Sequence, residues 1–152
     1  MSLMKYILIV FTILLLGSCV LRNTDRRNNR ENNIIMQEYP WVLNMKKINP
    51  NEADSIFDLI KDFNGISFSG IEIYEPSIRI KYTYGQYGKT LKEESFIINA
   101  NNGESFTAQE ILLKINNETA EILKDDPHYF FEGLEFQGRQ DGIATYQIMQ
   151  GS

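Results

Sequence analysis

The sequence is poor in the residues that build metal sites and cross-links. It holds one cysteine, Cys19, and one histidine, His128, in 152 residues. A single cysteine cannot form a disulfide within the chain. A zinc site at His128 would need its other ligands from carboxylates alone, which is not a typical zinc set. We therefore interpret Asp125–His128 as a helix end followed by a turn, and we expect no metal and no cofactor.

Catalytic motifs are also missing from the sequence. It contains no phosphate-binding glycine loop, no zinc-ligand spacing and no paired nucleophile and base. Hydrolase activity would have to rest on an acidic pair such as Glu132 and Glu135, and their spacing alone does not support that chemistry. We expect a protein that is not an enzyme, with hydrolase activity as a minor alternative.

Only one long apolar run occurs, and it lies at the N-terminus. Lys5 precedes an eleven-residue apolar run at 6–16, and the small residues Gly17 and Ser18 follow. At a helical rise of 1.5 Å per residue such a run covers about 17 Å. The hydrocarbon core of a bilayer is about 30 Å thick, so the run is too short to cross it. This order of features predicts a cleaved signal peptide over residues 1–18.

The stretch Leu16-Gly17-Ser18-Cys19 resembles the lipobox of bacterial lipoproteins. The resemblance covers the first nineteen residues and implies that a diacylglycerol thioether forms on Cys19, followed by cleavage before it. It also implies lipid anchoring in the cell envelope. In such lipoproteins Asp after the cysteine usually marks inner-membrane retention, so Val20 favours the outer membrane in a Gram-negative cell. Residues 20–27 do not resemble the acid-rich tether of surface lipoproteins, which favours a position facing the periplasm. An ordinary signal peptide cut nearby, which would leave a free thiol, is the alternative.

Charge is distributed unevenly along the chain. Residues 19–50 hold six Lys or Arg against three acids, a net +3, whereas residues 51–152 hold eight against seventeen, a net −9. The polar segment 19–33 has no apolar periodicity and is typical of a flexible tether. Residues 34–152 are numerous enough for a single domain. The acidic domain argues against nucleic acid as a ligand. An acidic face can attract a basic protein, but a net negative charge more often serves to keep a small domain soluble.

Apolar periodicity predicts two helices and about five strands after a short segment packed by Trp41. One helix begins at the cap Asn49 and ends at Gly65, and the second begins at the cap Thr107 and ends before Pro127. The expected buried face of the second helix includes Ile122. The expected strands cover 66–73, with a bulge at Ser69-Gly70, and 78–84, 91–99, 128–138 and 143–149. The prediction is an α+β fold, ordered α-β-β-β-α-β-β, with both helices on an antiparallel sheet.

Two groups of side chains are candidates for partner binding. Asp54, Asp58 and Asp62 follow one another at four-residue spacing and form an acidic stripe on the first helix. Tyr87 lies in the turn between two strands, where an aromatic ring would be exposed. Tyr82 and Tyr84 are in phase with apolar strand residues, so we expect them in the core.

These observations lead to one main functional hypothesis. We expect a membrane-anchored envelope lipoprotein whose acidic domain binds another protein, and the sharpest version is a toxin-immunity protein. The alternative is a cell-wall or envelope-assembly module that contacts glycan through Tyr87. Both hypotheses rest on size, charge and location, and fold class alone does not choose between them.

Overall fold

The structure is a computed structural model that describes residues 34–43, 46–85 and 90–151. All of these residues belong to one compact unit that begins at Ile34. Cys19, Tyr87 and the predicted signal peptide and tether lie outside the described residues. Within the described part of the chain, no helix is long and apolar enough to span a membrane.

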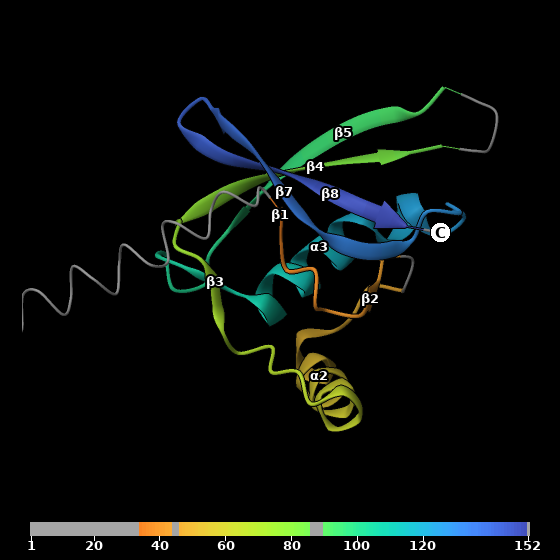
Figure 1. The fold of residues 1–152 in the computed structure, drawn as a ribbon, viewed down its shortest axis with the longest axis vertical. Helices are drawn as coiled ribbons and strands as arrows, with labels where there is room; N and C mark the ends of the chain where they lie inside the picture. Colours follow the sequence, from red (N-terminus) through yellow and green to blue (C-terminus); the bar gives the residue numbers. More distant parts are fainter. Residues whose placement is uncertain (1–33, 44–45, 86–89, 152) are drawn as a thin grey trace, which may run out of the picture. The chain divides into compact units, whose positions relative to one another are not determined.

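The main sheet is built from two hairpins that lie side by side (Figure 1). Strands β4 (Ser77–Tyr84) and β5 (Lys92–Asn99) form one antiparallel hairpin, and β7 (Phe130–Gln140) and β8 (Ile143–Gly151) form the other. β8 pairs with β4 in parallel and joins the hairpins. The short strands β1 (Ile34–Ile35) and β2 (Trp41–Val42) both pair with β7. The order is β1-β7-β8-β4-β5, with β2 beside β1 along β7.

The predicted α+β class, with two helices and a largely antiparallel sheet, is confirmed, but the strand count is wrong. The main sheet has six strands, and a second sheet pairs β3 (Ile71–Ile73) with β6 (Phe106–Thr107). The pairing of β8 with β4 is parallel, which the predicted antiparallel sheet did not include. Each hairpin still has the antiparallel pairing that its short connection dictates.

The predicted strand 66–73 forms only at its last three residues, and the reason is local. The carbonyl oxygens of Phe68 and Gly70 accept hydrogen bonds from Gln109 N at 3.0 Å and Ala108 N at 3.2 Å. These amides open a helix and have no partner within it. Residues 68–70 therefore accept hydrogen bonds from the first amides of the helix instead of continuing a strand. The bulge predicted at Ser69-Gly70 is wrong, because these residues precede β3 and belong to no strand; a register shift occurs instead between Ile71 and Ile73.

Helix α2 (Pro50–Asn64) has the ends that the sequence predicts. The Asn49 side chain caps it by accepting a 3.0 Å hydrogen bond from Asn51 N. Gly65 ends it in the left-handed region, with φ of 69°, and donates its N–H to Lys61 O. Phe57 lies on the buried face of the helix and stacks on Trp41 with ring centroids 4.9 Å apart. Aromatic stacking of this kind fixes α2 against the β2 segment.

Helix α3 (Ala108–Leu123) carries the central apolar face of the core. Thr107 caps it by accepting from Glu110 N at 3.2 Å. Four of its predicted core residues are fully buried, but Ile122 is 38% exposed, so the prediction for Ile122 is wrong. The fully buried ones are Ile111, Leu112, Ile115 and Leu123. Ile122 lies in the last turn of α3 and lines a hollow described below, whereas the next residue, Leu123, is fully buried.

Candidate functional site

The acidic stripe of α2 is exposed, but its three carboxylates are not equivalent. Asp54, Asp58 and Asp62 are all exposed. Asp54 Oδ1 accepts a 2.7 Å hydrogen bond from Gln109 Nε2, so this carboxylate already connects α2 to the first turn of α3. Asp58 and Asp62 have no ion pair with another described residue. The stripe therefore offers a partner two carboxylates rather than three.

A large apolar side chain lies beside these two carboxylates. Leu59 is 60% exposed, on the side of the amphipathic helix that faces away from the core. Helical spacing places Asp62 and Ser55 on the same side as Leu59, with Asp58 adjacent. We call Asp58, Leu59 and Asp62 the α2 face. The α2 face thus combines one exposed apolar side chain with two carboxylates on one side of it.

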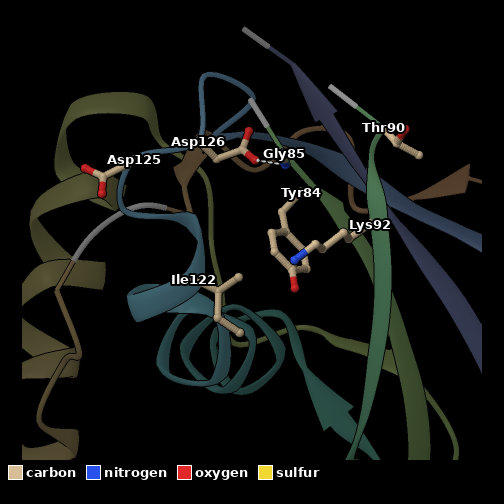
Figure 2. A pocket seen from close by; sticks show the side chains of 7 residues that line it. All are labelled: Tyr84, Gly85, Thr90, Lys92, Ile122, Asp125 and Asp126. Carbon is tan, nitrogen blue, oxygen red and sulfur yellow. Dashed lines mark hydrogen bonds between the residues drawn. The ribbon is translucent and has the colours of Figure 1, made fainter. Parts of the chain in front are cut away.

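A second candidate site is a hollow of about 300 Å³ between the β4–β5 hairpin and the end of α3. Figure 2 shows Tyr84 from β4 and Lys92 from β5 pointing toward Ile122 on α3. Lys92 Nζ lies 5.8 Å from the centroid of the Tyr84 ring. The remaining described lining comes from Gly85, Thr90, Asp125 and Asp126. The hollow thus combines an aromatic ring, an aliphatic side chain and an ammonium group.

Glu94 fixes the position of the aromatic ring. Tyr84 donates to Glu94 Oε1 at 2.6 Å and Tyr82 donates to Glu94 Oε2 at 3.0 Å. The two tyrosine rings stack with centroids 5.9 Å apart. These hydrogen bonds raise the pKa of the Tyr84 hydroxyl and lower the pKa of the Glu94 carboxyl. Burial, reinforced by its bond to Glu94, raises the pKa of the Tyr82 hydroxyl well above its usual value.

Asp126 is a buried residue that lines one end of this hollow. Its Oδ2 accepts from Gly85 N at 2.9 Å, and its Oδ1 accepts from His128 N at 2.8 Å. Figure 2 shows the bond to Gly85 as a dashed line. Asp126 and Tyr84 also line a second hollow of about 340 Å³, together with residues of β8 such as Met149. Because both carboxylate oxygens are occupied by backbone amides, Asp126 has a structural role in this site.

The other residues singled out in the sequence do not come together as a site. In the described ranges, no group of three or more His, Cys, Asp or Glu side chains is placed to hold a metal ion. Glu132 is exposed, and Glu135 accepts a 2.6 Å hydrogen bond from Gln137 Nε2. Tyr82 is buried, as predicted, but Tyr84 is only half-buried and lines the hollow.

Sequence reasoning missed Lys92 and Ile122 as site residues. The two lie far apart in the chain, and each fits an ordinary role, one as a charged strand residue and the other as an apolar helix residue. The sequence held one indication for Ile122. Pro127 predicts the end of the helix, and Ile122 lies close to that end. Comparison of the chain with known protein families, with curated proteins and with solved structures finds no match.

Proposed function

We propose that this chain is a lipid-anchored envelope protein, not an enzyme, whose α+β domain binds a basic protein through the α2 face. The observation that carries the proposal is Leu59, 60% exposed beside the carboxylates of Asp58 and Asp62. The net charge of −9 over residues 51–152 supports a basic partner. The sharpest form of the proposal is an immunity protein that neutralises a toxin arriving at the envelope.

The carboxylates and the leucine of the α2 face would act on different rates of binding. The carboxylates of Asp58 and Asp62 would attract a basic surface and raise the association rate, an effect that salt weakens. Leu59 would fill an apolar pocket of the partner, and its burial would slow dissociation. Asp54 would contribute little, since its carboxylate is bonded to Gln109.

The test starts from the full chain, solubilised in mild detergent and used to capture proteins from native envelope extract. A single stoichiometric basic protein, identified by mass spectrometry, would supply the partner for kinetic measurements. We expect the double variant Asp58→Asn and Asp62→Asn to lower the association rate, and Leu59→Ala to raise the dissociation rate. A toxicity assay of the partner, with and without this chain, tests the immunity form.

A matched control separates the α2 face from general charge. Glu104 and Glu118 are also exposed, and neither forms an ion pair with a described residue. The double variant Glu104→Gln and Glu118→Gln changes the net charge by the same amount and should leave the association rate nearly unchanged. An equal effect of both double variants would mean that overall charge acts, and the α2 face would lose its role.

The anchor is tested separately from the binding surface. Cys19→Ser removes the only thiol that could carry the lipid. We expect the variant chain to move from the detergent phase to the aqueous phase on phase separation, because each buried CH₂ of an acyl chain contributes about 0.8 kcal/mol to anchoring. The lipid anchor would be contradicted if Cys19→Ser partitioned like the parent protein and mass spectrometry found no lipid on the parent protein.

A further inference from the structure

We propose that the hollow between the β4–β5 hairpin and the end of α3 binds a sugar ring that carries a carboxylate. The proposal rests on Tyr84, Lys92 and Ile122, and is independent of the α2 face. At about 300 Å³ the hollow lies at the small end of ligand pockets, which suits one or two sugar rings.

Tyr84 supplies a fixed stacking surface. The C–H groups on one face of a sugar ring are weakly positive, and the face of an aromatic ring is negative, so the two attract each other. The bond to Glu94 and the stacking on Tyr82 hold the Tyr84 ring in place before a ligand arrives. A ring that is already ordered loses little conformational freedom on binding.

Ile122 gives the hollow an apolar wall on the α3 side. Its side chain is 38% exposed and points toward Tyr84 and Lys92 in Figure 2. A sugar between Tyr84 and Ile122 would cover apolar surface of both and leave its hydroxyl groups at the rim. Thr90, which is exposed at the rim, has a hydroxyl group for hydrogen bonding.

Lys92 selects the charge of the ligand. The ion pairs of the described residues do not include Lys92, which lies over the ring of Tyr84 and whose charge also helps to lower the pKa of the Glu94 carboxyl. The ammonium group lies over the face of the Tyr84 ring, so a sugar that stacks on this face has to move the flexible lysine aside. Lys92 can then pair with a carboxylate of the sugar, and such a charge-assisted hydrogen bond is about twice as strong as a neutral one. The same ammonium would repel a basic peptide, so the hollow and the α2 face would take different ligands.

The nearby acids do not cancel this preference. Asp126 accepts two backbone hydrogen bonds, and Glu94 accepts one from each of two tyrosines. Asp125 lies at the side of the hollow, and Figure 2 shows its carboxylate directed away from Tyr84. A ligand carboxylate can therefore approach Lys92 from the open side without facing an unpaired acid directly.

The experiment is a titration of the full chain in detergent micelles, followed by calorimetry and by amide chemical shifts. The probes are N-acetylmuramic acid, glucuronic acid, neutral N-acetylglucosamine and acetate. We expect either acidic sugar to bind at least tenfold more tightly than the neutral sugar, with shifts at Tyr84, Lys92 and Ile122. Tighter binding of N-acetylmuramic acid would indicate a cell-wall glycan, and tighter binding of glucuronic acid would indicate a uronic-acid polysaccharide.

Variants decide whether the named residues are responsible. Lys92→Gln should remove about tenfold of affinity for the acidic sugars and leave the neutral sugar unchanged, whereas Lys61→Gln, an exposed lysine on α2, should change neither. Tyr84→Phe keeps the ring but loses the bond to Glu94, so it should weaken binding only partly, whereas Tyr84→Leu should abolish it. Acetate binding as tightly as the sugars, no shift at the hollow, or an unchanged preference in Lys92→Gln would each overturn the proposal.

Discussion

Tyr84 and Glu94 lie diagonally across β4 and β5, and the Tyr84 hydroxyl donates a 2.6 Å hydrogen bond to Glu94 Oε1. The second oxygen of the same carboxylate accepts from Tyr82, which is buried in the core. Through Glu94, the edge strand β5 is thereby connected to the core. The candidate sugar site and the stability of the hairpin consequently depend on the same carboxylate.

This arrangement makes stability depend on pH on the alkaline side. Burial and the bond to Glu94 raise the pKa of Tyr82 above its ordinary value of 10.0. The unfolded chain therefore loses the Tyr82 proton first, and the contribution to stability is complete below about pH 10 and is lost as pH rises further. We expect Tyr82→Phe to show a shallower decrease of the unfolding free energy as pH rises above about 10. Urea titrations followed by Trp41 fluorescence measure it, and an equally steep decrease would contradict the role of Tyr82.

The contact between Phe57 and Trp41 should dominate the packing of α2. Phe57→Ala removes a buried ring that stacks on Trp41, and such losses typically cost about 3–5 kcal/mol. Leu59→Ala, on the exposed side of the same helix, should cost less than about 0.5 kcal/mol. Chemical denaturation of both variants gives the comparison. Similar losses in the two would mean that Leu59 is not exposed in solution.

Asp126 should be more important for stability than its neighbour Asp125. Asp126→Ala leaves the amides of Gly85 and His128 without their acceptors, at about 1–3 kcal/mol for each donor that stays buried. Asp125 is exposed, so Asp125→Ala should change stability by less than about 0.5 kcal/mol. Thermal and urea unfolding measure both. If the two variants lose equal stability, the two backbone hydrogen bonds that Asp126 accepts do not stabilise the fold as proposed.

A glycine is required at position 133, where β1 pairs with β7. Its φ is 124°, and a Cβ atom there would lie 2.7 Å from Ile35 O. Gly138 in the same strand also has a positive φ, of 95°, but open space around it. Gly133→Ala should therefore destabilise more than Gly138→Ala, with the excess, about 1–2 kcal/mol, arising from the clash. Hydrogen exchange at Ile35 should quicken only in Gly133→Ala, and equal exchange in both would contradict this explanation.

The sequence by itself determined the local features of this fold. The caps Asn49 and Thr107 start the two helices where predicted, because a cap satisfies backbone groups only a few residues away. The turn at Asp141-Gly142 joins β7 and β8, and both residues have the positive φ that such tight turns need. The alternation Ile78, Ile80, Tyr82 likewise identifies the buried face of β4.

Only the tertiary structure decided how these elements combine. The parallel pairing of β8 with β4, the use of Phe68 and Gly70 as acceptors for α3, and the exposure of Ile122 all depend on contacts between distant segments. The hollow gathers Tyr84, Lys92 and Ile122 for the same reason. Periodicity reports which face of an element is apolar, but it does not report how far the neighbouring element extends to cover that face. Sequence reasoning was therefore weakest where side chains of β4, β5 and α3 meet, which is where the candidate site lies.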